Sequence, residues 1–96
     1  MLSNEKIIEN VYKLSMAVRL KNHMVANALE KAVPNLLVYE KNLADASKSE
    51  LLKIREVGSA TVDYILKIIE GENIHKIVKS IEKPKKGRLG EMKWKW

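Results

Sequence analysis

Residues 51–66 read Leu51-Leu-Lys-Ile-Arg-Glu-Val-Gly-Ser-Ala-Thr-Val-Asp-Tyr-Ile-Leu66 and contain two helical patterns separated by a short turn. Leu51, Ile54 and Val57 follow one another at the three-residue spacing of a helix face. A second apolar stripe with helical spacing runs through residues 62–69. The stretch therefore predicts two consecutive helices joined by a tight turn.

The turn between these two helices is predicted to bind an anion. It is centred on residues 56–59, where Gly58 allows the backbone a positive φ or a close approach to another group. Ser59 or Thr61 is expected to cap the second helix, whose first N–H groups then point outward. A tight turn that leads into a helix N-terminus binds anions, and on DNA the anion is a phosphate.

The segments on both sides of the turn carry helix start and stop signals. Ser47-Lys-Ser-Glu50 has the spacing of a capping box, in which the Ser oxygen and the Glu carboxylate each accept a hydrogen bond from the other residue's backbone. This box predicts that the first helix spans about residues 48–55. The second helix is expected to span about residues 60–70 and to end at Gly71.

The N-terminal part of the chain predicts two longer helices. The first spans about residues 4–20, is capped by Ser3 or Asn4, and is so apolar that we expect it to be well buried or covered on two sides. Its apolar residues are Ile7, Ile8, Val11, Tyr12, Leu14, Met16, Val18 and Leu20. The second begins after the cap Asn22 and should end near Val33, because a residue that precedes proline disfavours helical backbone. Its inward-facing residues are expected to be Met24, Val25, Ala28, Leu29 and Ala32.

The remaining segments predict short elements. Residues 36–39 form an apolar connector or a further helical turn, and residues 42–46 form a loop. Asn73 is expected to cap a short helix over residues 74–82, which Pro84 ends. No strand pattern or internal repeat is present. The predicted fold class is all-α, a compact bundle of four to five helices.

Composition excludes several classes of function. The chain has 96 residues, which suits one small domain, and it has no cysteine for a disulfide, a thiolate metal site or a nucleophile. No apolar run approaches the roughly 18 residues that cross a bilayer, and the N-terminus lacks the pattern of a signal peptide. We therefore expect a cytoplasmic protein without a membrane partner. Abundant Lys, Glu and Ile hint at an archaeal or thermophilic source.

The net charge of +6 is concentrated near the C-terminus. Residues 1–72 contain ten basic and ten acidic side chains, whereas residues 73–96 contain eight basic and two acidic ones. This asymmetry predicts a helical domain over residues 1–83 followed by a flexible basic tail over residues 84–96 that meets a polyanion or an acidic partner. A tail that only improves solubility is the alternative.

The tail combines cations with aromatic residues. Lys85, Lys86 and Arg88 are expected to contact DNA phosphates. Trp94 and Trp96 could stack on exposed bases, dock in an apolar groove of a protein partner, or fold back on the chain's own core. The sequence leaves these three alternatives open.

No catalytic or metal-binding pattern is present in the sequence. His23 and His75 are far apart and lack a carboxylate at metal-ligand spacing, so no metal and no cofactor are predicted. No phosphate-binding loop motif and no arrangement of Ser, His and Asp for nucleophilic catalysis can be assembled. The interpretation that remains is a binding protein.

The order of these elements resembles the helix-hairpin-helix N-terminal domain of the X-family DNA polymerases, the lyase domain of polymerase beta, over about residues 5–82. A related domain lies at the N-terminus of a DNA nuclease subunit. The family usually has Gly-hydrophobic-Gly at the turn, where this chain has Glu56-Val-Gly58, and a small residue where it has Val62. A carboxylate at position 56 would repel a phosphate, so Glu56 should point away, towards Arg55 or Lys53, or else the hairpin is not the contact.

The resemblance implies binding of the 5′-phosphate end of gapped or nicked DNA. The family lysine that forms a Schiff base with an abasic sugar falls on Tyr64, whose phenol cannot form the imine. A phosphate-binding lysine falls on Lys76 and is retained, whereas another falls on Ala60 and is lost. The resemblance therefore implies DNA contact without the lyase reaction. A residual lyase that uses Lys67 is a further hypothesis.

We predict from the sequence a non-enzymatic protein that binds the DNA backbone without sequence preference, with a role in DNA repair or replication. The residues expected to contact nucleic acid are Lys53, Gly58, Ser59, Ala60, Thr61, Lys67, Lys76, Lys79, Lys85, Lys86 and Arg88. The alternative is a protein-protein interaction adaptor of a DNA-processing complex, which docks through residues 84–96.

Overall fold

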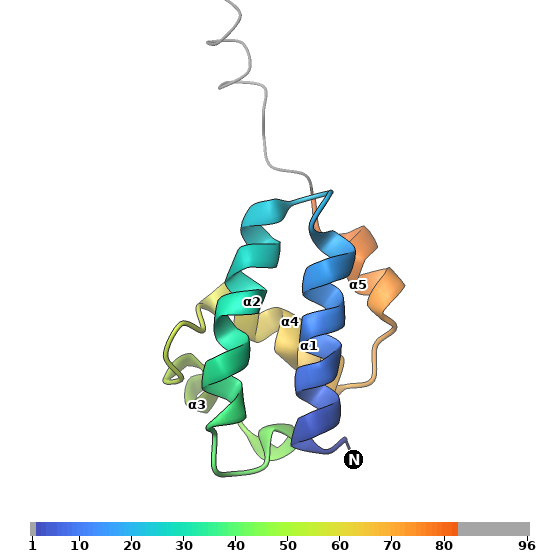
Figure 1. Cartoon of the computed structure of the whole chain (residues 1–96). Coiled ribbons are helices and arrows are strands. Elements are labelled where there is room, and N and C mark those ends of the chain that lie inside the picture. Colours follow the sequence, from blue (N-terminus) through green and yellow to red (C-terminus); the bar gives the residue numbers. More distant parts are fainter. Residues whose placement is uncertain (1, 83–96) are drawn as a thin grey trace, which may run out of the picture.

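Every regular element within residues 2–82, the part of the chain that the computed structural model describes, is a helix (Figure 1). In chain order the elements are the helix α1 (Asn4–Val18), the helix α2 (His23–Leu37), the 3₁₀ helix η1 (Leu43–Asp45), and the helices α3 (Lys48–Leu52), α4 (Ser59–Ile69) and α5 (Ile74–Ser80). The predicted all-helical class is confirmed for these residues.

The helices α1 and α2 lie side by side and antiparallel (Figure 1). The Ser3 hydroxyl caps α1 by accepting a hydrogen bond from Lys6 N at 3.2 Å. The chain reverses after Val18, whose carbonyl accepts from Asn22 N at 2.8 Å. The side chain of Asn22 then caps α2 by accepting from Val25 N at 3.2 Å, as the sequence predicts. Two local caps thus define the start of each long helix.

Helix α2 continues past Pro34 to Leu37, so the predicted end near Val33 is wrong. A proline inside a helix removes one backbone donor and costs roughly 3 kcal/mol. The additional turn brings Leu36 into the core, where it is fully buried. Burial of a leucine side chain contributes roughly 1.5–3 kcal/mol, which offsets most of the cost of the proline.

The segment between α2 and α3 is tied to the start of α1. The side-chain oxygen of Asn4 accepts from Leu43 N at 2.8 Å, and its amide nitrogen donates to the Lys41 carbonyl at 2.8 Å. Part of the predicted loop 42–46 is therefore the 3₁₀ helix η1, and Leu43 is fully buried.

Helix α3 begins at the predicted capping box. The Ser47 hydroxyl accepts from Glu50 N at 3.2 Å, and Ser47 N donates to the Glu50 carboxylate at 2.9 Å. The helix ends at Leu52 rather than near residue 55. It tightens at this point, because Ile54 N donates to the Leu51 carbonyl three residues earlier, at 3.1 Å.

Helix α4 ends at Gly71 as predicted. The glycine has φ 86°, a conformation that residues with a side chain rarely adopt. Gly71 N donates to the Ile68 carbonyl at 2.9 Å, and Glu72 N donates to the Lys67 carbonyl at 3.0 Å. These two bonds form a Schellman motif, which satisfies carbonyls that the helix end leaves free.

Helix α5 begins after the predicted cap Asn73, whose side chain accepts a hydrogen bond from His75 N at 2.7 Å. The helix ends at Ser80 rather than at residue 82. The turn between α1 and α2 contacts the C-terminal end of α5. Lys21 Nζ donates to the Val78 carbonyl at 2.9 Å, and the Asn22 side chain donates to the Glu82 carbonyl at 3.0 Å.

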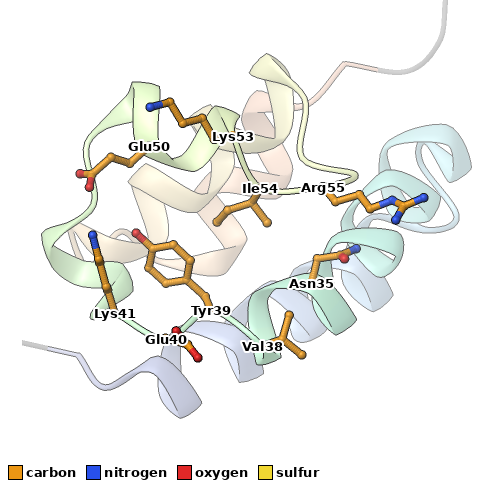
Figure 2. Close-up of a pocket in the computed structure, with 9 residues that line it drawn as sticks. All are labelled: Asn35, Val38, Tyr39, Glu40, Lys41, Glu50, Lys53, Ile54 and Arg55. Carbon is orange, nitrogen blue, oxygen red and sulfur yellow. The ribbon is translucent and has the colours of Figure 1, made fainter.

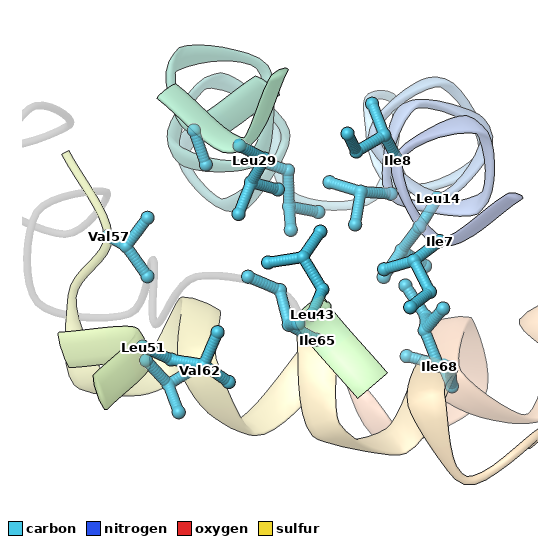
Figure 3. Close-up of a cluster of buried hydrophobic side chains, with 14 of the residues drawn as sticks. Ile7, Ile8, Leu14, Leu29, Leu43, Leu51, Val57, Val62, Ile65 and Ile68 are labelled. Carbon is cyan, nitrogen blue, oxygen red and sulfur yellow. The ribbon is translucent and has the colours of Figure 1, made fainter. Parts of the chain in front are cut away.

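One apolar cluster fills the space between the α1–α2 pair and α4 (Figure 3). Leu43 of η1 lies at its centre, between the side chains of α1 and α2 and those of α4 (Figure 3). The cluster anchors α4 through fully or almost fully buried residues on one of its faces: Val62, Ile65 and Ile68.

Helix α1 contacts α2, α4, α5 and η1, and one of its faces stays open. Tyr12, Met16 and Leu20 are exposed, with half or more of each side chain accessible. Met24 of α2 is also exposed, although its apolar character predicted an inward position. These residues lie on helix faces that no other described element covers, and apolar character alone does not distinguish such a face.

Candidate functional site

Among the α-helices within residues 2–82, α4 alone begins without a side-chain cap. Gly58 occupies the cap position with φ −89° and ψ 177°, and no side chain caps the helix. The first intrahelical bond runs from Val62 N to the Gly58 carbonyl at 2.9 Å. The N–H groups of Ser59, Ala60 and Thr61 therefore lack helical partners. Side chains cap the other four α-helices.

Gly58 does not have the positive φ expected of it. The left-handed residue of the turn is Glu56, with φ 67°. Val57 is almost fully buried, and its N–H closes a turn on the Ile54 carbonyl at 3.2 Å. The chain must therefore reverse immediately before Val57. A Cβ added at Gly58 would meet nothing within 4 Å, so no close approach requires a glycine there either.

The predicted caps of α4 are also wrong. Ser59 is the first residue of the helix rather than its cap, because the helix begins one residue earlier than expected. Thr61 lies within the first turn, and its side chain is buried. No side chain therefore caps the start of α4.

The Glu56 side chain lies against α2. It lines a surface hollow together with Met24, Asn27, Ala28 and Lys31. It makes no ion pair with Lys53 or Arg55, in contrast to the expected direction. The carboxylate is therefore turned towards the α2 side of the turn.

The predicted cations fall into separate groups. Lys53 lines a hollow between the end of α2 and α3, together with Lys41 and Arg55 (Figure 2). Lys67 lies in a different hollow on α4, and Lys76 and Lys79 are exposed on α5. The predicted contact residues therefore do not form one continuous patch.

The hollow on α4 does not have a charge that favours an anion. Ala60, Tyr64 and Lys67 line it together with two acidic residues, Asp63 and Glu70. Asp63 Oδ1 also accepts an ion pair from Lys48 Nζ at 3.4 Å. With Asp63 paired to Lys48, the charges of Lys67 and Glu70 balance, so this hollow has no excess positive charge that would favour a phosphate.

Tyr64 is half-buried on α4. Burial raises the pKa of its phenol above the ordinary value of 10.0, and the neighbouring charge of Asp63 raises the pKa further. The group is therefore a neutral phenol at physiological pH.

The predicted site residues of the tail lie outside the described residues. They are Lys85, Lys86, Arg88, Trp94 and Trp96. His23 and His75 lie at the starts of α2 and α5, and no three His, Cys, Asp or Glu side chains in the described part gather to hold a metal ion. No helix within residues 2–82 is long and apolar enough to cross a bilayer.

The sequence does not identify two residues of the hollow in Figure 2 as site residues. Tyr39 was predicted only as part of a connector, and Lys41 was assigned no role. They follow α2, whereas Lys53 and Arg55 follow α3. Only the packing of the segment after α2 against the turn brings these four residues together.

Comparisons with protein-family models, with curated proteins and with solved structures found no match for this chain.

Proposed function

We propose that this chain binds the phosphate backbone of DNA without sequence preference. The observation that carries the proposal is the uncapped start of α4, where the N–H groups of Ser59, Ala60 and Thr61 have no partner in the helix and no side-chain cap. Free N–H groups and the helix dipole together attract a phosphate. Ser59 and Ala60 are exposed, so a DNA backbone can approach them.

We further propose that α3, the turn and α4 form a helix-hairpin-helix. The resemblance assigns a glycine to position 56, and Glu56 has the positive φ that glycine adopts without a steric penalty. The turn therefore has the backbone conformation that the motif's first glycine would permit. The short helix α5 follows with Lys76, as in the polymerase domain.

Cations elsewhere on the chain would strengthen binding by releasing counterions from DNA. They are Lys53, Lys67, Lys76 and Lys79, together with the tail cations Lys85, Lys86 and Arg88. Residues 2–82 contain twelve basic and eleven acidic side chains, so few phosphates are neutralised by this part of the chain. We expect affinity in the micromolar range or weaker at physiological salt.

An abasic-site lyase activity is not part of this function, because a phenol stands where the lysine nucleophile would be needed. Borohydride trapping on abasic DNA tests this point. A covalent adduct would reveal a lyase that uses another lysine, such as Lys67.

A pair of variants at Gly58 tests the proposed contact. The backbone of Gly58 suits any residue, and a new Cβ meets nothing within 4 Å, so Gly58→Asn and Gly58→Asp should both fold. Both side chains can cap α4, but only aspartate adds a negative charge beside the proposed phosphate. Fluorescence anisotropy would measure binding to labelled duplex, single-stranded and 5′-phosphorylated gapped DNA over a salt series.

We expect wild type to bind most tightly, Gly58→Asn less tightly, and Gly58→Asp about fivefold or more weakly than Gly58→Asn. The last difference corresponds to a repulsion of about 1 kcal/mol or more between two charges a few ångströms apart. Equal affinities of the asparagine and aspartate variants would contradict a phosphate at this helix start. Absence of binding by wild type at low salt would contradict the function as a whole.

A protein-protein interaction adaptor is the second candidate function. The exposed apolar side chains of α1 and α2, among them Tyr12, Met16 and Met24, favour a protein partner over DNA. In that case the segment 84–96 would dock on the partner. Deletion of residues 84–96 would then abolish partner capture, whereas a DNA-binding chain would keep its contact at α4 and lose part of its salt dependence.

A further inference from the structure

The hollow between the end of α2 and the turn after α3 has the size and lining of a binding site (Figure 2). Its volume is about 530 Å³, within the roughly 300–1,000 Å³ of small-molecule sites. Residues 38–41 form one side, and α3 with residues 53–55 forms the other. The hollow adjoins the turn that leads to Gly58, but it is a different surface from the start of α4.

The charged groups of this hollow favour an anion. Lys41, Lys53 and Arg55 are exposed, and none of them makes an ion pair within residues 2–82. Of the two carboxylates, that of Glu50 already accepts from Ser47 N at 2.9 Å. Glu40 is the other carboxylate in the lining. Three cations thus face two carboxylates, and since the capping hydrogen bond leaves Glu50 charged, the lining has an excess of one positive charge.

The floor of the hollow supplies an aromatic surface. Tyr39 and Ile54 are half-buried and pack against the hydrophobic core, so their positions are held by the fold. Figure 2 shows Lys41 and Glu50 to the left of the Tyr39 ring, Lys53 above it, Glu40 below it, and Ile54 and Arg55 to its right. An aromatic ring with three cations among its neighbours can stack on a base and bind the flanking phosphates of one nucleotide.

The base that stacks on Tyr39 must be unpaired. In a duplex both faces of each base are covered by neighbouring bases, and a surface ring cannot reach them. Lys53 and Arg55 belong to the same turn as Gly58. The hollow therefore adjoins the turn that precedes α4.

We infer that the hollow lined by Tyr39, Lys41, Lys53 and Arg55 holds an unpaired nucleotide of single-stranded DNA. This inference rests on the proposed function and adds a second contact surface for the same DNA, separate from the start of α4. Tyr39 stacks on the base, and the three cations neutralise the phosphates on either side of it.

The site is tested by fluorescence anisotropy, which measures the affinity for three labelled probes. They are an oligo-dT of ten nucleotides, a blunt duplex, and the same duplex with a single-stranded dT extension. Tyr39→Leu removes the ring, and Tyr39→Phe retains it. Tyr12→Leu is the matched control, because Tyr12 is half exposed on α1 and does not line the hollow. Circular dichroism would confirm that each variant is folded.

We expect Tyr39→Leu to weaken binding of oligo-dT and of the extended duplex about fivefold or more, with little change for the blunt duplex. Tyr39→Phe and Tyr12→Leu should bind like wild type. Loss of binding by Tyr39→Phe to the same extent as by Tyr39→Leu would overturn stacking, as would unchanged binding of oligo-dT by Tyr39→Leu.

A second variant keeps the test valid if Tyr39→Leu unfolds. Lys41 is exposed, so Lys41→Gln should fold, and it should reduce the slope of log affinity for oligo-dT against log salt by about 0.7. Lys13→Gln on α1, outside the hollow, should leave the slope unchanged. Equal slopes for wild type and Lys41→Gln would overturn the phosphate contact. If wild type binds the blunt duplex but Tyr39→Leu and Lys41→Gln do not change the binding of any probe, this site alone is refuted. If wild type binds none of the three probes, the proposed function is refuted as well.

Discussion

Replacement of Glu56 by glycine should stabilise the fold, because Glu56 is the one residue other than glycine with a positive φ in the described part. Its φ of 67° lies in the left-handed region, where a Cβ crowds the following carbonyl oxygen. The perturbation removes that Cβ and leaves the path of the turn unchanged.

The magnitude follows from two opposing contributions. The left-handed conformation costs a residue with a Cβ about 1–2 kcal/mol relative to glycine. Glycine in turn loses more conformational entropy on folding, which costs about 0.4–1 kcal/mol. We therefore expect Glu56→Gly to raise the free energy of unfolding by about 0.8 kcal/mol, the difference between the middles of these two ranges.

Alanine variants isolate the backbone effect from the loss of the carboxylate. Glu56→Ala also removes the charge but keeps the strain, so it should be about 1 kcal/mol less stable than Glu56→Gly. Gly58→Ala should change stability by less than about 0.5 kcal/mol, because φ is −89° there and the Cβ meets nothing within 4 Å.

Urea unfolding followed by circular dichroism at about 222 nm measures these differences, since the described fold is helical. A difference of about 1 kcal/mol corresponds to a shift of roughly 4–8 °C in Tm for a domain of this size. If Glu56→Ala proved as stable as Glu56→Gly, the backbone at position 56 would not be left-handed in solution, and the turn described here would be wrong.

Three further substitutions test the core and two ionisable groups. Leu29→Ala should lower the free energy of unfolding in urea by about 2–5 kcal/mol, because Leu29 is fully buried; a loss under 1 kcal/mol would contradict that burial. The backbone N–H and the hydroxyl of Ser47 lower the pKa of Glu50 below 4.5. The ionised Glu50 carboxylate therefore stabilises the fold above pH 4.5, and this contribution is lost as the pH falls through the lowered pKa. Ser47→Ala should cost about 1 kcal/mol near neutral pH and flatten this acid dependence in pH-dependent unfolding, and an unchanged dependence would contradict the capping box. Burial, with a smaller contribution from Asp63, raises the pKa of Tyr64 above 10.0, so stability should fall as the pH rises above 10. Tyr64→Phe should remove that part of the fall, and an unchanged fall in pH-dependent unfolding would contradict the raised pKa.

Helix starts could be predicted from the sequence because capping is a local interaction. The caps of α1, α2, α3 and α5 are side chains of Ser or Asn placed next to the residues whose N–H groups they accept. Helix ends were predicted less well. Helix α2 passes Pro34 because Leu36 gains burial against residues distant in the sequence, and a local rule contains no information on such contacts.

The turn shows the same limit at a smaller scale. The sequence predicted the positive φ of the turn at Gly58, because glycine adopts a positive φ most easily. The position is in fact determined by burial of Val57, which requires the reversal at Glu56. The hollow with Tyr39 and Lys41 could not be predicted at all, because it combines a segment that follows α2 with one that follows α3.

The most direct test of backbone binding at α4 is an NMR titration of the ¹⁵N-labelled chain with a short 5′-phosphorylated gapped duplex. If a phosphate binds at this helix start, the amide signals of Ser59, Ala60 and Thr61 should shift most, saturate with the DNA concentration, and return towards their free positions as salt is added. Shifts confined to other parts of the chain, with these three amides unchanged at saturation, would contradict a phosphate contact at the start of α4.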